Sequence, residues 1–289
     1  MIKIIEKDLT KDSTIRTPAF TKYFTYINND KDIVEAIDFV KENNLRFKVL
    51  GNGSNILFSK KYYDDILFIK LSDGFKSIIM HDEYVEIGGS YSLIQAGRSL
   101  VGQGYEDYIF FNLIPATIGG AIRQNAGTGD GEEIEDVCSY CRVFDIVDMK
   151  IVELSNMEMQ FKYRHSIVKS YPERYIVLSA KFKLENKTNK IDKLILEMKN
   201  RVKEKTAREP KGYCFGSTFM NNKMSAWQYI DSIIEQLPSM EGAFFSRKHK
   251  NWIINNDADG IVVEKLIRQA QLLIKDKFNI DLKEEVDII

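Results

Sequence analysis

The stretch LIPATIGGAIRQNAGTG (residues 113–129) is nearly uncharged, although 29% of the whole chain is charged. Arg123 is its single charged residue. Pro115 fixes φ and lacks a backbone donor, Gly119-Gly120 removes two successive side chains, and Asn125 tolerates a positive φ. Such a segment brings bare backbone close to a flat or anionic ligand, or packs tightly inside a core. Its composition alone leaves both interpretations open.

The size and charge of the chain restrict its class. At 289 residues it exceeds one ordinary hydrophobic core, so we expect two or three domains. Its 41 basic and 42 acidic residues are well mixed and create no overall field that would attract nucleic acid or an anionic membrane. Residues 1–16 lack the apolar core of a signal peptide, and no later run is long enough to span a membrane. We therefore expect a cytoplasmic protein without nucleic-acid or membrane partners.

The cysteines and histidines do not predict a metal site. Cys138, Cys141 and Cys214 make an odd count, and the three histidines are scattered along the chain. Cys138 and Cys141 lie in VCSYCRVFDIV (137–147), which reads as a strand, so their side chains should point to opposite faces. We expect packing thiols in a reducing compartment and no bound metal.

Apolar periodicity predicts a chain of mixed helices and strands. Beyond the strand at 137–147, strands are predicted at 150–154 and 175–184, and helices at about 191–205 and 260–277. The run FKVLGNGSNILF (47–58) reads as a strand and a glycine turn, where free backbone N–H groups could converge on an anion. It lacks the GxGxxG spacing of a dinucleotide-binding turn, because position 56 is Ile. The polar run ENKTNK (185–190) is typical of a joint between domains.

Six polar islands stand in apolar surroundings, and their order is informative. In order they are GNGSN (51–55), IPATIGGAIRQNAG (114–127), KYRHS (162–166), CFGSTF (214–219), SRKHKNWIIN (246–255) and LKEEV (282–286). They resemble the LGxGSN, IPGxxGGAxxxNAG, YRxS, GSxFxN, GGAxxSxKHxNFIxN and LExEV motifs of the UDP-N-acetylenolpyruvoylglucosamine reductase family. The resemblance covers nearly the whole chain. Each motif is weak alone, but six in order are highly specific.

The resemblance implies a mixed α+β and α/β fold of the FAD-linked oxidase (PCMH-like) type. In that fold an N-terminal α/β lobe (1–72) and a strand-rich lobe (73–186) bind FAD, and a C-terminal α/β domain (187–289) binds substrate. The interval between Arg164 and Ser217 is short, which is similar to the family's shorter subtype. The implied cofactor is FAD, the hydride donor is NADPH, and the substrate is a UDP-linked amino sugar.

The resemblance also assigns site residues. Ser217, Arg164 and Glu285 match the family's catalytic residues. The chemistry suits them: an enolate is basic enough to take a proton from a neutral serine, an arginine offers a planar fork to a carboxylate, and a buried glutamate can share a proton. The expected cofactor-binding residues are Gly51, Asn52, Gly53, Ser54, Asn55, Pro115, Gly119, Gly120, Asn125, Ala126 and Gly127. The expected substrate-binding residues are Tyr163, Asn221, Lys248, His249 and Asn251. The basic residues of 201–211 are expected to form mostly a solvated helix face, with one or two at a diphosphate.

The chain departs from the family at a few positions. STIRTPAFTKYF (13–24) lacks the Gly-Gly pair of the family's NTFRVGGPA, and Ala116 replaces a glycine that a positive φ could require. Lys283 and Asp287 replace a Glu and an Arg. Besides the peptidoglycan reductase, two alternatives therefore stay open: a paralogue that reduces an enolpyruvyl group on another nucleotide sugar for a surface glycan, and a non-catalytic flavin- or ligand-binding scaffold. Retention of all three catalytic residues favours an enzyme.

Overall fold

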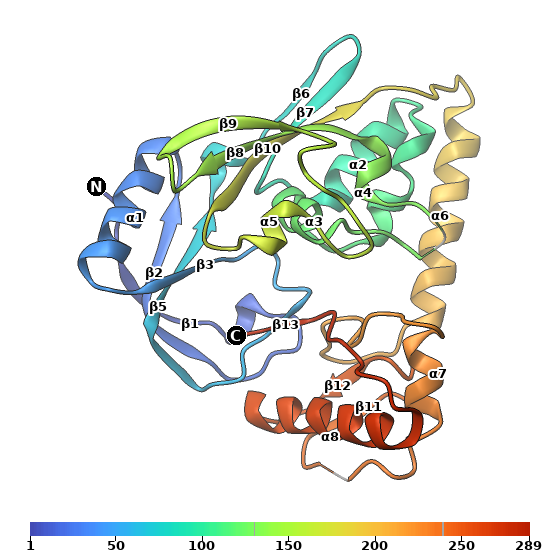
Figure 1. The fold of residues 1–289 in the computed structure, drawn as a ribbon. Helices are drawn as coiled ribbons and strands as arrows, with labels where there is room; N and C mark the ends of the chain where they lie inside the picture. The colour runs from blue at the N-terminus through green and yellow to red at the C-terminus, as the bar shows by residue number, and fades with distance from the viewer. Residues whose placement is uncertain (130, 239) are drawn as a thin grey trace. The chain divides into compact units, whose positions relative to one another are not determined.

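The computed structural model describes residues 1–129, 131–238 and 240–289 (Figure 1). The chain forms two compact units. Unit 1 comprises Met1–Ile5, Phe24–Asn52 and Asp65–Thr206, and unit 2 comprises Glu6–Tyr23, Gly53–Asp64 and Ala207–Ile289. The division into domains after residues 72 and 186 stays a prediction.

A four-stranded sheet is formed by the N-terminal part of the chain. Its order is β1 (Ile5–Asp8), β2 (Phe20–Ile27), β5 (Tyr62–Leu71) and β3 (Arg46–Val49), and β3 runs parallel to β5. Short 3-10 turns follow β1 and β5 at η1 (Thr10–Asp12) and η2 (Asp73–Phe75). Helix α1 (Asp30–Glu42) separates β2 from β3 in the chain, and the Asn29 side chain caps it by accepting hydrogen bonds from two backbone N–H groups.

The main sheet of unit 1 is antiparallel and has five strands. Their order is β6 (Ile78–Met80), β7 (Tyr84–Gly88), β10 (Tyr175–Lys183), β8 (Cys138–Asp145) and β9 (Lys150–Ser155). The central strand β10 is buried along most of its length. The three strands predicted between residues 137 and 184 are confirmed.

Cys138 and Cys141 both point into the core of unit 1, so the prediction of opposite faces is wrong. The pairing of β8 with β10 shifts between Tyr140, which faces Lys181, and Cys138, which faces Phe182. The residue between Cys138 and Tyr140 is therefore extra, and it forms a β-bulge that reverses the alternation of side chains. The two sulfur atoms consequently lie 3.5 Å apart, and both cysteines are fully buried.

Short helices cover one face of this sheet (Figure 1). They are α2 (Leu93–Gly102), η3 (Glu106–Tyr108), η4 (Phe110–Leu113), α3 (Ile118–Gln124), α4 (Ile134–Val137) and α5 (Ile167–Ser170). Leu100, Phe111, Ile122 and Phe182 belong to the apolar core that they share with the strands. Much of the 113–129 stretch is thus core structure, and its glycines allow close packing at α3.

Unit 2 has its own core. Helix α8 (Gly260–Phe278) packs on the hairpin of β11 (Ala243–Phe245) and β12 (Ile253–Asn255), and helix α7 (Ala226–Asp231) contacts α8. The last strand, β13 (Asp287–Ile288), runs parallel to β4 (Ile56–Leu57). Helix α6 (Ile191–Arg208) precedes this part of the chain. The helices predicted at 191–205 and 260–277 are both confirmed.

Candidate active site

The glycine turn after β3 meets the start of α3 within unit 1. Thr117 is the N-cap of α3, and its Oγ1 accepts a hydrogen bond from the backbone N of Gly120 at 3.2 Å. A Cβ added at Gly51 would lie 2.7 Å from that same oxygen. A Cβ added at Gly119 would lie 3.2 Å from the carbonyl oxygen of Gly89. The glycines therefore let three backbone segments approach one another closely.

A cavity of about 140 Å³ is formed next to this cap. Three cationic side chains, Lys48, Lys70 and Arg123, are among its lining residues, and none of the described lining residues is a carboxylate. The rest of the lining comes from the ends of β3 and β5, from the turns after β3 and β7, from Thr117 and α3, and from residues 168–177. Positive charge beside a capped helix start and glycine backbone suits an anionic group. The residues present thus fit the diphosphate of FAD.

Some of the predicted cofactor-binding residues are at this cavity. Gly51, Asn52, Gly119 and Gly120 line it, and the carbonyl oxygen of Pro115 accepts a hydrogen bond from Asn52 Nδ2 at 3.4 Å. These five residues thus come together in unit 1, as a common ligand would require.

Ala116 does not have a positive φ. Its carbonyl oxygen accepts a hydrogen bond from Leu93 N at 2.9 Å, and its own N–H donates to Ile114 O at 2.9 Å. The backbone at this position therefore has no conformational need for the glycine that the family pattern places there.

The second half of the GNGSN turn belongs to unit 2 and supports the C-terminal segment. Gly53 has φ +69°, and a Cβ added there would lie 1.9 Å from the carbonyl oxygen of Asp12. Ser54 is half-buried. Asn55 Nδ2 donates a hydrogen bond to the carbonyl oxygen of Glu285 at 3.0 Å. Of the five predicted residues of this turn, Gly51 and Asn52 thus line the cavity, and residues 53–55 belong to unit 2.

Arg164 lies at the tip of a tight turn. The backbone groups of Lys162 and His165 exchange two hydrogen bonds, of 3.2 and 2.9 Å, so Tyr163 and Arg164 form a two-residue loop. Arg164 has φ +54°, a left-handed conformation that a residue with a side chain rarely adopts. Ser166 caps α5 and donates a hydrogen bond to the carbonyl oxygen of Arg123 at 2.8 Å. The YRHS motif is therefore an anchored turn that presents Arg164.

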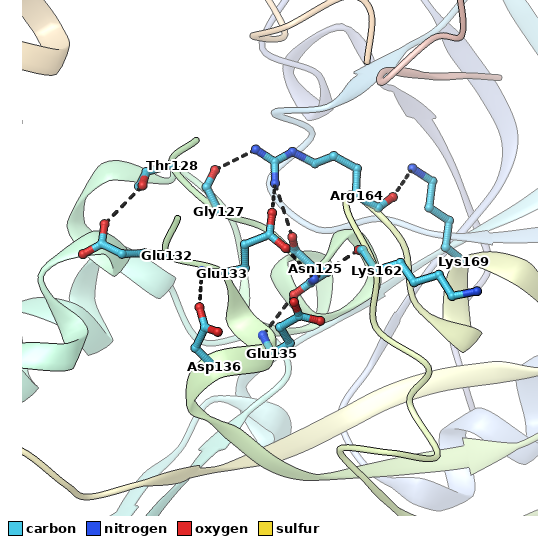
Figure 2. Close-up of polar contacts among 10 residues, drawn as sticks. All are labelled: Asn125, Gly127, Thr128, Glu132, Glu133, Glu135, Asp136, Lys162, Arg164 and Lys169. Atoms are coloured by element: carbon cyan, nitrogen blue, oxygen red, sulfur yellow. Dashed lines mark hydrogen bonds and ion pairs between the residues drawn. The ribbon is translucent and has the colours of Figure 1, made fainter. Parts of the chain in front are cut away.

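The guanidinium of Arg164 is almost fully buried and is held by Asn125, Gly127 and Glu133 (Figure 2). Nη1 donates to Glu133 Oε1 at 3.1 Å and to Asn125 O at 3.5 Å, and Nη2 donates to Gly127 O at 3.0 Å. Its CZ atom lies 4.9 Å from the centre of the Tyr163 ring, within the range of a cation–π contact. Arg164 therefore occupies a defined position.

Asn125 and Glu133 stabilise each other in the same network. Asn125 has φ +43° at the C-cap of α3, and its Nδ2 donates to Glu133 Oε2 at 2.9 Å and to Lys162 O at 3.1 Å. Burial raises the pKa of the Glu133 carboxyl, although the nearby charge of Arg164 acts in the opposite direction. Asn125, Ala126 and Gly127 thus lie at the Arg164 network and are not among the residues that line the cavity.

In unit 2, the segment that carries Ser217 pairs with the segment that carries Glu285. The backbone N of Glu285 donates to the carbonyl oxygen of Thr218 at 2.9 Å, and Phe219 pairs with Glu284 in an antiparallel bridge. Ser217 follows Gly216, which has φ +82°. The structure thus brings the backbones of two of the three predicted catalytic residues together.

Asn251 supports the Ser217 segment from its other side. Its Oδ1 accepts a hydrogen bond from Phe219 N at 3.0 Å, its Nδ2 donates to Phe219 O at 2.8 Å, and its carbonyl oxygen accepts from Thr218 N at 2.7 Å. Ser217 also pairs with Trp252 in an antiparallel bridge. The segment that bears Ser217 is therefore the middle of three paired segments.

The other predicted substrate-binding residues have separate contacts in unit 2. Asn221 Oδ1 accepts a hydrogen bond from Ala226 N at 2.9 Å at the start of α7. Lys248 Nζ donates to Glu209 O at 2.7 Å, and the His249 ring lies 5.3 Å from that of Trp252. Tyr163, which belongs to unit 1, is exposed.

Several residues of the site were not predicted from the sequence. The cavity residue Gly89 follows a strand within a Gly-Gly-Ser run, the same signal that identified GNGSN, and could have been found in this way. Lys48 and Lys70 carry no signal that separates them from solvated lysines. Glu133 also resembles an ordinary surface acid in the sequence, because its contact with Arg164 is tertiary.

The residues that the structure describes form neither a metal-ligand cluster nor a membrane-spanning helix. Among them no group of three or more His, Cys, Asp or Glu side chains is arranged to hold a metal ion. None of the helices in the described part of the chain has the length and apolar character needed to cross a lipid bilayer.

Comparison with known proteins identifies the family. Residues 21–155 match the family model for an FAD binding domain, and residues 208–289 match the C-terminal domain of UDP-N-acetylenolpyruvoylglucosamine reductase. The UDP-N-acetylenolpyruvoylglucosamine reductase of Bacillus pumilus is 32% identical over 296 residues, which cover 99% of this chain and 94% of the relative. The enzyme of the same name from Caldanaerobacter subterraneus is 35% identical over 269 residues, which cover 89% and 84%.

A solved structure confirms the predicted fold class. The crystal structure of UDP-N-acetylenolpyruvylglucosamine reductase from Thermus caldophilus aligns with a TM-score of 0.82 and 22% identity, over 100% of this chain and 99% of that one. Relatives of this name match 84–94% of their own length at 32–35% identity, and two family models match the flavin-binding part and the C-terminal domain. This chain therefore belongs to the UDP-N-acetylenolpyruvoylglucosamine reductase family of FAD-dependent oxidoreductases.

Proposed function

We propose that this protein reduces the enolpyruvyl ether of UDP-N-acetylglucosamine enolpyruvate to UDP-N-acetylmuramate, with FAD as cofactor and NADPH as hydride donor, in the cytoplasm. The observation that carries the proposal is the pairing of the segments bearing Ser217 and Glu285, in a chain whose relatives are named for this reaction. When bound, FAD supplies the hydride that adds to C3 of the enolpyruvyl group.

Ser217 is proposed to protonate C2. Addition of hydride to C3 leaves an enolate-like carboxylate, whose C2 is basic enough to accept a proton from a neutral hydroxyl. The pairing with Trp252 defines the backbone at Ser217, so little backbone entropy remains to be lost when the hydroxyl meets C2.

Arg164 and Glu285 are proposed to act on the carboxylate of the enolpyruvyl group. The guanidinium of Arg164 carries a delocalised positive charge, which would stabilise the oxygens on which negative charge develops. The backbone of Glu285 is held by Thr218 and by the side chain of Asn55, so its carboxyl is carried on the segment next to Ser217. It would share a proton with the enolised carboxylate.

The test separates the two half-reactions of the purified, FAD-loaded protein. NADPH should bleach the flavin absorbance, and UDP-N-acetylglucosamine enolpyruvate should restore it. Ser217→Ala should leave bleaching nearly intact and slow the restoration by about 10²- to 10³-fold, the typical loss for one such group. Ser232→Ala removes another serine of unit 2, whose hydroxyl donates to Tyr229 O, and should leave both steps unchanged.

Two results would overturn the proposal. A protein that does not take up FAD would instead support a non-catalytic scaffold. A reduced protein that is reoxidised by a different enolpyruvyl nucleotide sugar, and not by this one, would instead support the paralogue.

A further inference from the structure

The guanidinium of Arg164 has one anionic partner, Glu133, among the hydrogen bonds described above. The other acceptors among these bonds are neutral backbone carbonyls, those of Asn125 and Gly127. All three bonds are charge-assisted because the donor is a cation, but Glu133 adds the Coulomb attraction of a full negative charge, which the carbonyls lack. The pair is largely shielded from water, because the Arg164 and Glu133 side chains are 10% and 18% exposed.

Glu133 is itself fixed in place. Its backbone N–H donates to Asp136 Oδ2 at 2.8 Å at the start of α4. The Glu133 backbone also pairs with that of Gly127 in an antiparallel bridge. Its second carboxylate oxygen accepts a hydrogen bond from Asn125 Nδ2 (Figure 2). Because the Glu133 backbone and both of its carboxylate oxygens are held, its carboxylate can fix the position of the guanidinium that it contacts.

The neighbouring acid, Glu132, has different partners. It accepts hydrogen bonds from both terminal nitrogens of Arg201 on α6 and from the hydroxyl of Thr128. Arg201 is therefore engaged by a carboxylate within unit 1. Two consecutive glutamates of one loop thus hold two different arginines, which makes Glu132 a matched control for Glu133.

We infer that Glu133 is a positioning residue for Arg164, which holds the guanidinium where it meets the carboxylate of the substrate. This inference rests on the proposed function, in which Arg164 binds the enolpyruvyl carboxylate. The left-handed backbone of Arg164 sets the direction in which its side chain leaves the turn, and the contacts of the guanidinium then fix its position. Without Glu133, the buried guanidinium loses the carboxylate among its described partners.

The experiment compares Glu133→Gln with Glu132→Gln in the FAD-loaded protein. A displacement of about 1 Å of a positioned group costs about 10²-fold in rate. Glu133→Gln should therefore slow reoxidation by UDP-N-acetylglucosamine enolpyruvate by about 10- to 100-fold. Flavin reduction by NADPH should stay within about twofold, because it does not use the enolpyruvyl carboxylate. Glu132→Gln should leave both rates near those of the wild type.

A second readout does not depend on activity. Phenylglyoxal modifies accessible arginines, and peptide mass mapping locates the modified residue. Arg164 should react faster in Glu133→Gln than in the wild type, and Glu132→Gln should accelerate only the labelling of Arg201. If the wild type is not reoxidised by this substrate, the proposed function fails, but the labelling still tests whether Glu133 holds Arg164.

Glu133→Asp keeps the charge and shortens its reach, which covers the case in which Glu133→Gln does not fold. Glu133→Asp should slow reoxidation by less than Glu133→Gln does, and Arg164 should be labelled faster in it than in the wild type. In a double-mutant cycle with Arg164→Lys, the two losses should not add, because both act through one guanidinium. Equal slowing of both half-reactions, additive losses, or unchanged labelling of Arg164 in the glutamate variants would each overturn the inference.

Discussion

Replacing Asn251 by alanine should destabilise unit 2 and disorder the segment that carries Ser217. The Asn251 amide makes two hydrogen bonds, of 3.0 and 2.8 Å, to the backbone N and O of Phe219, which is fully buried. Alanine would leave both backbone groups unpaired, and each unsatisfied buried group costs about 1–3 kcal/mol. We therefore expect Asn251→Ala to lower the free energy of unfolding by about 3 kcal/mol.

The measurement is urea unfolding followed by tryptophan fluorescence. Trp227 and Trp252, the chain's two tryptophans, both belong to unit 2, so the signal reports on that unit. Asn222→Ala is the control, since its exposed side chain bonds only to the N–H of the next residue among the contacts described. It should change the free energy of unfolding by less than about 0.5 kcal/mol.

The sequence predicted that Asn251 binds substrate. The two roles, binding substrate and supporting the Ser217 segment, give different results in the alanine variant. If Asn251 mainly contacts substrate, the alanine variant would keep nearly the stability of the wild type and show a raised KM. If it mainly supports the Ser217 segment, stability falls and reoxidation slows through kcat. A loss below about 1 kcal/mol would contradict the supporting role, because it is smaller than the cost of one unpaired group.

Three further predictions follow from particular contacts. Gly53→Ala places a Cβ 1.9 Å from Asp12 O at φ +69°, so it should lower the free energy of unfolding in urea by more than about 3 kcal/mol. Gly129→Ala places a Cβ with no atom within 4 Å and should lower it by only about 1 kcal/mol. Cys214 is half-buried, while burial raises the pKa of the Cys141 thiol; the thiol reagent DTNB should therefore react with one cysteine of the native protein and with all three after denaturation. The hydrogen bonds from Arg201 lower the pKa of Glu132, so this pair stabilises the fold above the unfolded carboxyl pKa of about 4.3 and loses that effect as the pH falls through the lower folded value. The wild type should therefore have a higher free energy of unfolding than Arg201→Gln at pH 7, and this difference should disappear below about pH 4. A difference that does not change with pH would contradict the prediction.

The sequence predicted best what depends on local pattern. Helix α8 was expected at 260–277 and spans Gly260–Phe278, because its apolar residues recur at helical spacing along its whole length. The strand faces of Cys138 and Cys141 were predicted wrongly, because a bulge depends on how β8 pairs with β10 and leaves no trace in the alternation of β8 itself. Pairing between distant parts of the chain could thus not be predicted from local pattern. The contact between Arg164 and Glu133 could not be predicted for the same reason.

A motif in the sequence also mixes two kinds of residue that only the structure separates. Within IPATIGGAIRQNAG, Gly119 lines the cavity, whereas Asn125 ends α3 in a left-handed conformation and bonds to Glu133 and Lys162. Both are equally recognisable in the sequence, yet of the two only Gly119 is among the residues that line the cavity. Because the second orders the partner of a proposed catalytic arginine, an Asn125→Ala variant should resemble Glu133→Gln in slowing reoxidation, without the loss of FAD expected when a side chain is added at Gly119.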